Sequence, residues 1–267
     1  MYLQSKVRKE CYLRMSKFFI NTEQINQNKI SIKGQDVNHI KNVLRKKVND
    51  EIIICDAQES KDYFCKIVDF MDDEIMCEIN KKIDNDFESN IKVTIFQGLP
   101  KSDKMELVIQ KSVELGVFEI TPIEMKRCVV KLNQKEKNKK IERWQKISEV
   151  AAKQCGRGII PQINNIISIK DVCNLCNKYD ILLVAYENEK VNTLKKEIDN
   201  IKNTFMEKEL NIGIVIGPEG GIDEKEIEIL KESGAKIVTL GKRILRTETV
   251  ALNIISIIMY ELETVEK

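Results

Sequence analysis

The chain has 267 residues, of which 42% are hydrophobic, so it is long enough for one large domain or two smaller domains with cores of their own. Its 44 Lys and Arg nearly balance its 42 Asp and Glu, which excludes a uniformly basic or acidic protein and leaves only local charge to indicate a partner. No apolar run reaches the roughly 20 residues that cross a bilayer, so no membrane partner is predicted, and eight scattered cysteines favour a reducing, cytoplasmic compartment over a disulfide framework.

Residues 1–14 are expected to be a disordered extension, because the patterned sequence begins at Met15. The short apolar or alternating runs that follow, separated by Asn, Asp and Gln, are typical of a small β-barrel or a curled sheet. Strands are predicted over residues 18–20, 51–55, 63–70 and 74–79. A helix is predicted over residues 35–47, and Arg45, Lys46 and Lys47 give it a basic end that is either solvated or in contact with an RNA backbone.

A polar stretch without periodicity, residues 81–90, indicates a domain boundary. We place the first domain at residues 15–85 and the second at residues 86–267. The second domain begins with a strand-like run over residues 91–97.

The next helix is predicted to begin at Asp103, where Glu106 three residues later completes a capping box, and to end at Gly116. Lys111 shares an exposed face of this helix with Glu114. That face is either a salt-bridged surface or part of an RNA-binding surface.

Positive charge is concentrated over residues 126–146, which hold nine Lys or Arg against two acids. This excess, which includes Arg127 and Lys131, favours binding of a polyanion such as RNA over a solvated loop. A helix is predicted over residues 139–155, and Gln154 and Arg157 add polar donors at its end.

Histidine and cysteine patterns argue against a metal site. His39 is the only histidine, which excludes most histidine-based metal sites and Ser/His/Asp triads. Cys173 and Cys176 form a C-x-x-C without a second pair, so a structural role is favoured.

Two loops near the C-terminal end of the chain are predicted to form a ligand site. An apolar strand over residues 212–216 leads into a glycine-rich loop, and a helix, a strand over residues 237–240 and a second loop follow. This order places both loops at the carboxyl ends of neighbouring parallel strands, where open α/β sheets bind ligands. The glycine-rich loop matches neither the dinucleotide nor the Walker pattern, and its Glu219 would repel a polyphosphate.

The second loop leads into an apolar helix over residues 250–259. A helix that is hydrophobic on all sides is buried, either in its own domain or against another subunit. Arg246 lies beside the N-terminal end of this helix, where the macrodipole disfavours a cation unless an anionic partner or a ligand compensates. A binding site is therefore favoured here.

Five motifs of the second domain strongly resemble the RsmE family, ribosomal small-subunit RNA methyltransferases of the SPOUT superfamily that methylate N3 of a uridine. The motifs are KMELVIQKSVELGV at 104–117, RCVVKL at 127–132, WQKISEVAAKQCGR at 144–157, IGPEGGIDEKEIE at 216–228 and LGKRILRTETVAL at 240–252. The stretches MSKFFI and HIKNVLRKKVNDEIIICD look like that family's PUA-like RNA-binding domain. The resemblance implies a PUA-like β-barrel domain followed by a SPOUT-type α/β trefoil-knot domain, S-adenosylmethionine as methyl donor, no metal, a homodimer, and ribosomal RNA or the small subunit as partner.

The resemblance also implies site residues. The donor pocket would be lined by Ile216, Gly217, Pro218, Glu219, Gly220, Gly221, Leu240, Gly241, Ile244, Leu245 and Thr249. Arg246 is expected to stabilise a uracil anion, and Glu248 or a positioned water to accept the N3 proton. Two alternatives stay open: a SPOUT methyltransferase that acts on transfer RNA or a ribose 2′-hydroxyl, and a non-catalytic RNA-binding ribosome-assembly factor.

Overall fold

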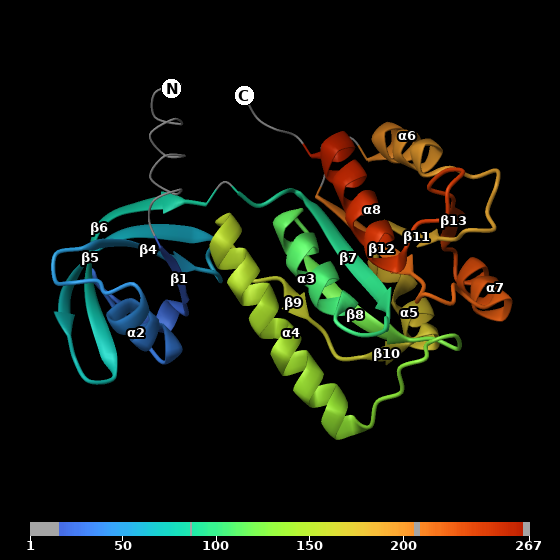
Figure 1. Ribbon diagram of the computed structural model, residues 1–267. Helices are drawn as coiled ribbons and strands as arrows, with labels where there is room; N and C mark the ends of the chain where they lie inside the picture. Colours follow the sequence, from blue (N-terminus) through green and yellow to red (C-terminus); the bar gives the residue numbers. More distant parts are fainter. Residues whose placement is uncertain (1–15, 86, 206–208, 264–267) are drawn as a thin grey trace. The chain divides into compact units, whose positions relative to one another are not determined.

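The computed structural model describes residues 16–85, 87–205 and 209–263 (Figure 1). They form two compact units. The first unit extends to Glu88 and also takes in the segment Ala152–Ile160, and the second contains Ser89–Ala151 and the chain from Pro161 onward. The return of a short later segment to the first unit was not predicted. The extension expected at residues 1–14 lies outside the described residues.

A six-stranded sheet forms most of the first unit. Its order is β1 (Lys17–Ile20), β4 (Glu51–Asp56), β5 (Lys61–Phe70), β6 (Glu74–Asp84), β3 (Lys29–Lys33) and β2 (Ile25–Asn26), with a short 3₁₀ turn η1 (Thr22–Gln24) after β1. β1 pairs with β4 in parallel, and the other pairs are antiparallel. Alternate residues such as Ile52 and Ile54 point into one buried core. The predicted strands are confirmed with shifted ends, whereas β3 was missed although Ile30 and Ile32 alternate with polar residues.

The helix predicted over residues 35–47 is wrong in length. A short α-helix α2 (Gln35–Asn38) passes into a π-helical turn η2 (His39–Val43) and stops there. Arg45 adopts φ +52°, a left-handed conformation that ends a helix. The N–H of Lys47 then donates to Oδ2 of Asp50 at 2.8 Å, a local bond that replaces the helical one.

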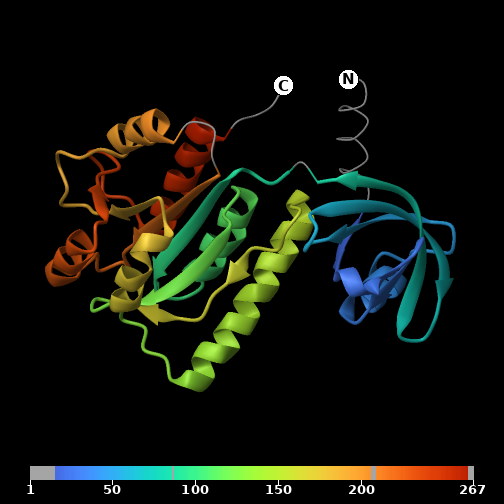
Figure 2. The same cartoon turned by 180° about the vertical axis from the view of Figure 1, so that it is seen from behind.

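A sheet of parallel strands forms the centre of the second unit (Figures 1 and 2). Its order is β10 (Ile167–Ser168), β8 (Glu119–Glu124), β7 (Ile91–Gly98), β12 (Leu210–Ile216), β11 (Ile181–Ala185) and β13 (Lys236–Val238), and β9 (Gln162–Ile163) also pairs with β8. Strands buried on both faces read as continuous apolar runs, which is why β12 was predictable. The two loop-bearing strands, β12 and β13, were expected to be neighbours, and this is wrong because β11 pairs with both of them.

The helices connect these parallel strands. They are α3 (Lys104–Glu114), α4 (Gln134–Cys155), α5 (Ile169–Leu175) followed by the 3₁₀ turn η3 (Cys176–Lys178), α6 (Leu194–Thr204), α7 (Glu224–Glu232) and α8 (Thr247–Leu262). None of the helices in the described residues is long and apolar enough to cross a membrane. The trefoil knot implied by the resemblance stays a prediction.

Helix ends follow the local sequence at α7 but not at α3. Asp223 caps α7 by accepting from the N–H of Lys225, and Gly234 follows the helix at φ +97°. The capping box predicted at Asp103 is wrong, since its side chain forms no cap hydrogen bond. Glu106 instead binds Arg143 of α4 at 2.7 Å, because tertiary packing brings a cation to it.

Candidate methyl-transfer site

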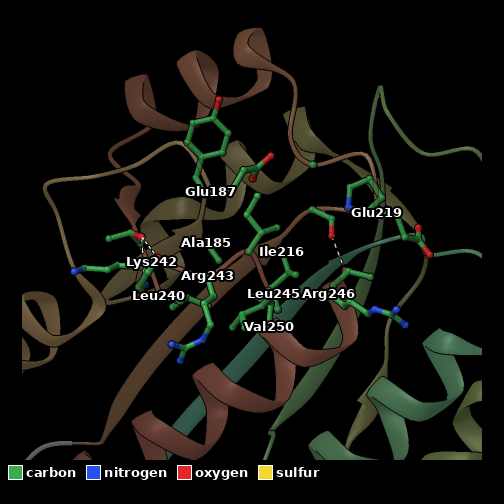
Figure 3. Close-up of a pocket in the computed structure, with 18 of the residues that line it drawn as sticks. Ala185, Glu187, Ile216, Glu219, Leu240, Lys242, Arg243, Leu245, Arg246 and Val250 are labelled. Carbon is green, nitrogen blue, oxygen red and sulfur yellow. Dashed lines mark hydrogen bonds between the residues drawn. The ribbon is translucent and has the colours of Figure 1, made fainter.

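A cavity of about 380 Å³ lies at the carboxyl ends of β11, β12 and β13 (Figure 3). Ala185 and Ile216, the last residues of β11 and β12, form part of its wall, and Leu240 and Leu245 of the loop after β13 form another part. This volume falls within the range of small-molecule sites. The parallel sheet therefore brings the two predicted loops together even though their strands are not adjacent.

The glycine-rich loop after β12 requires glycine at defined positions. Gly221 adopts φ +71°, and a Cβ atom there would lie 2.3 Å from Oε1 of Glu187. A Cβ atom on Gly217 would lie 2.8 Å from Cγ1 of Ile222. Contacts this short do not occur between real side chains. The Glu187 carboxylate could move away, so the positive φ is what favours glycine at residue 221, whereas close packing favours it at residue 217.

A buried polar network holds the glycine-rich loop against the start of α8. The hydroxyl of Thr247 donates to the carbonyl oxygen of Gly217 at 2.6 Å and accepts from Nε2 of Gln97 at 2.8 Å. Gln97, which lies in β7, is fully buried. This network fixes one wall of the cavity.

One lysine side chain lies near two glutamate side chains at one end of the cavity. Nζ of Lys104 is 2.9 Å from Oε1 of Glu219 and 3.6 Å from Oε2 of Glu248. The hydrogen bond to Glu219 raises the pKa of Lys104. Burial pushes the pKa of Glu219 upward, but the hydrogen bond from Lys104 and those from backbone N–H groups outweigh it and leave that pKa below its usual value.

Arginine and lysine side chains lie on two sides of the cavity. Figure 3 shows Glu219 and Arg246 at one side of the pocket and Lys242 and Arg243 at the other. Arg246 is the N-cap residue of α8 and is exposed. Within the described residues, no carboxylate forms an ion pair with it, so its guanidinium is available to a ligand.

The expected donor contacts, apart from Gly220 and Thr249, line this cavity together with Arg246. Glu248 does not line it, and its Oε2 atom is buried. Residues that were not assigned to the donor site but do line the cavity are Lys104, Ala185, Tyr186, Glu187, Thr239, Lys242, Arg243, Thr247 and Val250. Tyr186 and Glu187 directly follow a buried strand, and that position is the signal that could have identified them.

The expected RNA contacts fall into different environments. Arg157 is 6% exposed, and Glu88 binds its guanidinium through both carboxylate oxygens at 2.9 and 2.7 Å. A buried arginine that is paired with a carboxylate is not accessible to an RNA backbone, so Arg157 is no longer a candidate RNA contact. Lys111 pairs with Glu114 at 2.8 Å, the salt-bridged surface that was the alternative.

Other candidate contacts are accessible. Arg45, Lys47, Lys131 and Gln154 are exposed, and Lys46 is half-buried. Arg127 is also exposed but donates to the carbonyl oxygen of Gly220 at 3.2 Å, so it contacts the glycine-rich loop itself. These residues remain candidates for RNA binding.

Two domain families match this chain. Residues 87–259 match the family described as RNA methyltransferase domain, and residues 32–80 match the RNA methyltransferase PUA domain. A parallel α/β unit with a pocket at its strand ends, joined to a PUA domain, thus defines an RNA methyltransferase of the SPOUT class.

Similar proteins identify the family within this class. Ribosomal RNA small subunit methyltransferase E of Bacillus subtilis is 38% identical over 87% of this chain and 90% of its own length, and that of Mesomycoplasma hyopneumoniae is 35% identical over 89% and 96%. The crystal structure of that enzyme from Neisseria gonorrhoeae, bound to S-adenosyl methionine, is 29% identical, covers 95% of this chain and 100% of its own, and superposes with a TM-score of 0.80. The chain belongs to the ribosomal RNA small subunit methyltransferase E family, and the RsmE resemblance is confirmed.

Proposed function

We propose that this protein transfers the methyl group of S-adenosylmethionine to N3 of a uridine in small-subunit (16S) ribosomal RNA. The observation that carries the proposal is the cavity between the two loops, formed by the same residues that carry the family motifs. The SAM-bound relative and the names of the curated relatives support the donor and the RNA class.

The chemistry of the cavity fits the donor. Ile216, Leu240 and Leu245 offer an apolar wall, and Ile244 is 85% exposed at the cavity, where a flat base could cover it. Without side chains at Gly217 and Gly221, the backbone of the glycine-rich loop can approach a ligand closely. The bound donor would supply an electrophilic methyl group.

Arg246 would stabilise the other substrate. N3 of uridine is protonated at neutral pH and becomes a nucleophile only after that proton leaves, which places negative charge on the uracil ring. The guanidinium of Arg246, which forms no ion pair within the described residues, would compensate this charge. Glu248 or a positioned water would accept the proton, and a water is the simpler acceptor because Oε2 of Glu248 is buried.

RNA would bind through exposed or half-buried basic residues of both units. Arg45, Lys46 and Lys47 of the first unit and Arg127 and Lys131 of the second are the proposed phosphate contacts. A homodimer in the cytoplasm is part of the proposal. Tyr260, near the end of α8, is 87% exposed, so this helix has an outer face that a second subunit could cover.

The decisive experiment is methylation of small ribosomal subunits from cells that lack the modification. Labelled S-adenosylmethionine and purified protein are added, and the nucleosides are analysed. Label in 3-methyluridine from small-subunit RNA is expected. Label in a ribose-methylated nucleoside, or incorporation only into transfer RNA, would contradict the proposal, and absence of both donor binding and label would favour an assembly factor.

A further inference from the structure

An ionic link joins three segments that are distant in the sequence. Lys104 is the first residue of α3, Glu219 lies in the glycine-rich loop, and Glu248 lies in the first turn of α8. Lys104 is within salt-bridge range of both carboxylates. The N–H of Lys101 also donates to Oε1 of Glu219 at 3.0 Å, so the segment after β7 contacts the loop at two points.

The burial of Glu248 distinguishes this link from an ordinary surface ion pair. The Glu248 side chain is 14% exposed, and its Oε2 atom has no hydrogen-bond partner among the described residues. Among the residues that the structure describes, Lys104 is the only cation in salt-bridge range of Glu248. A largely buried carboxylate requires compensating charge. The N-terminal end of α8 supplies part of it, and Lys104 supplies a cation, so Lys104 helps to fix the position of the first turn of α8.

The linked segments carry the two halves of the proposed reaction. The glycine-rich loop forms the wall for the methyl donor, whereas the start of α8 carries Arg246, proposed to act on the uridine. Methyl transfer requires these halves to be aligned, and a displacement of about 1 Å can reduce the rate about 100-fold.

We propose that Lys104 is a positioning residue, which holds the glycine-rich loop and the first turn of α8 at the separation that aligns donor and uridine. This inference rests on the proposed methyl transfer. Lys104 acts through Glu219 and Glu248 and does not contact the RNA. An RNA phosphate contact is the competing role, because the Lys104 side chain is 31% exposed and lines the cavity.

Steady-state kinetics separate these roles. In Lys104→Met, kcat is expected to fall about 100-fold while the KM for RNA changes less than about threefold, since positioning affects the transition state and a phosphate contact affects binding. Lys104→Arg should recover most of kcat, because a guanidinium can bridge the same carboxylates. Lys104→Met with unchanged kcat, or with a raised KM only, overturns the proposal, as does Lys104→Arg that is no better than Lys104→Met.

A matched control lies at the opposite end of the parallel sheet from the cavity. Lys92 near the start of β7 pairs with Glu209 just before β12, and Lys92→Met should keep wild-type kcat. If Lys104→Met is unstable, Glu219→Gln alone tests the same link and should lower kcat; an unchanged kcat overturns the proposal. If Lys104→Met is stable, the double variant should be no slower than the slower single variant, because both changes break the Lys104–Glu219 ion pair; additive losses overturn the proposal. Absence of methyl transfer by the wild-type protein would refute the proposed function, which is a distinguishable result.

Discussion

The hydroxyl of Thr247 provides a direct test of how the pocket wall is held. Thr247→Val keeps the side-chain shape but removes the donor to Gly217 and the acceptor for Gln97. Gln97 is fully buried, and its Oε1 atom has no hydrogen-bond partner among the described residues. Its Nε2 group would keep the carbonyl oxygen of Gly98 as acceptor but could not replace the lost bond from solvent. A buried polar group without a partner costs about 1 to 3 kcal/mol. We therefore expect about 2 kcal/mol of destabilisation, or about 4 to 8 °C in the melting temperature of the second unit.

Calorimetry measures both consequences of this substitution. Scanning calorimetry reports the melting temperature. Titration with S-adenosylmethionine should show that the affinity for the donor is about 10-fold lower, because the lost hydrogen bonds reduce the population of the loop conformation that binds the donor. Thr204→Val is the control, since the Thr204 hydroxyl donates to Asn200 at 2.8 Å on the exposed end of α6. A Thr247→Val protein that melts and binds donor like Thr204→Val would refute the reasoning.

Three further substitutions test other parts of the site. Gly221→Ala places a Cβ atom 2.3 Å from Glu187 at φ +71°, so the donor affinity measured by titration calorimetry should fall at least about 10-fold. A second change, Glu187→Ala, should restore only part of this affinity because the backbone strain at residue 221 remains. Arg246→Ala should abolish labelled methyl transfer while donor affinity stays near wild type, and normal turnover would contradict its assignment. Arg157→Ala removes the cation from the Glu88 carboxylate, which keeps the N–H of Gly158. The melting temperature should therefore drop by the equivalent of about 3 kcal/mol, while RNA affinity in filter binding is unchanged; weaker RNA binding by a stable variant would make Arg157 an RNA contact again.

Features set by neighbouring residues were predictable from the sequence. The apolar run of β12, the Asp223 cap and the helix end at Gly234 are present as expected. The glycine-rich loop was also recognised, because backbone conformations at positive φ select glycine regardless of the surrounding fold. These signals placed the cavity at the correct edge of the sheet.

Two local patterns did not predict the partners that tertiary packing supplies. Glu106 has the spacing of a capping box, yet Arg143 of α4 binds it. Arg157 was predicted to be a polar donor at the end of a helix, yet it is buried and forms an ion pair with Glu88. In both cases an ion pair formed by tertiary packing is present where the local pattern predicted a different role.

The sequence by itself determined the two-part organisation, the family and the loops that form the cavity, because motif, periodicity and turn chemistry all act within one element. Only the tertiary structure decided that β11 separates β12 from β13, that Gln97 supports Thr247 across 150 residues, and that Lys104 links two carboxylates. Periodicity predicts which face of an element is buried but not which element covers it. The partner of a buried polar group therefore depends on how the elements pack, and that choice is made by the whole core at once.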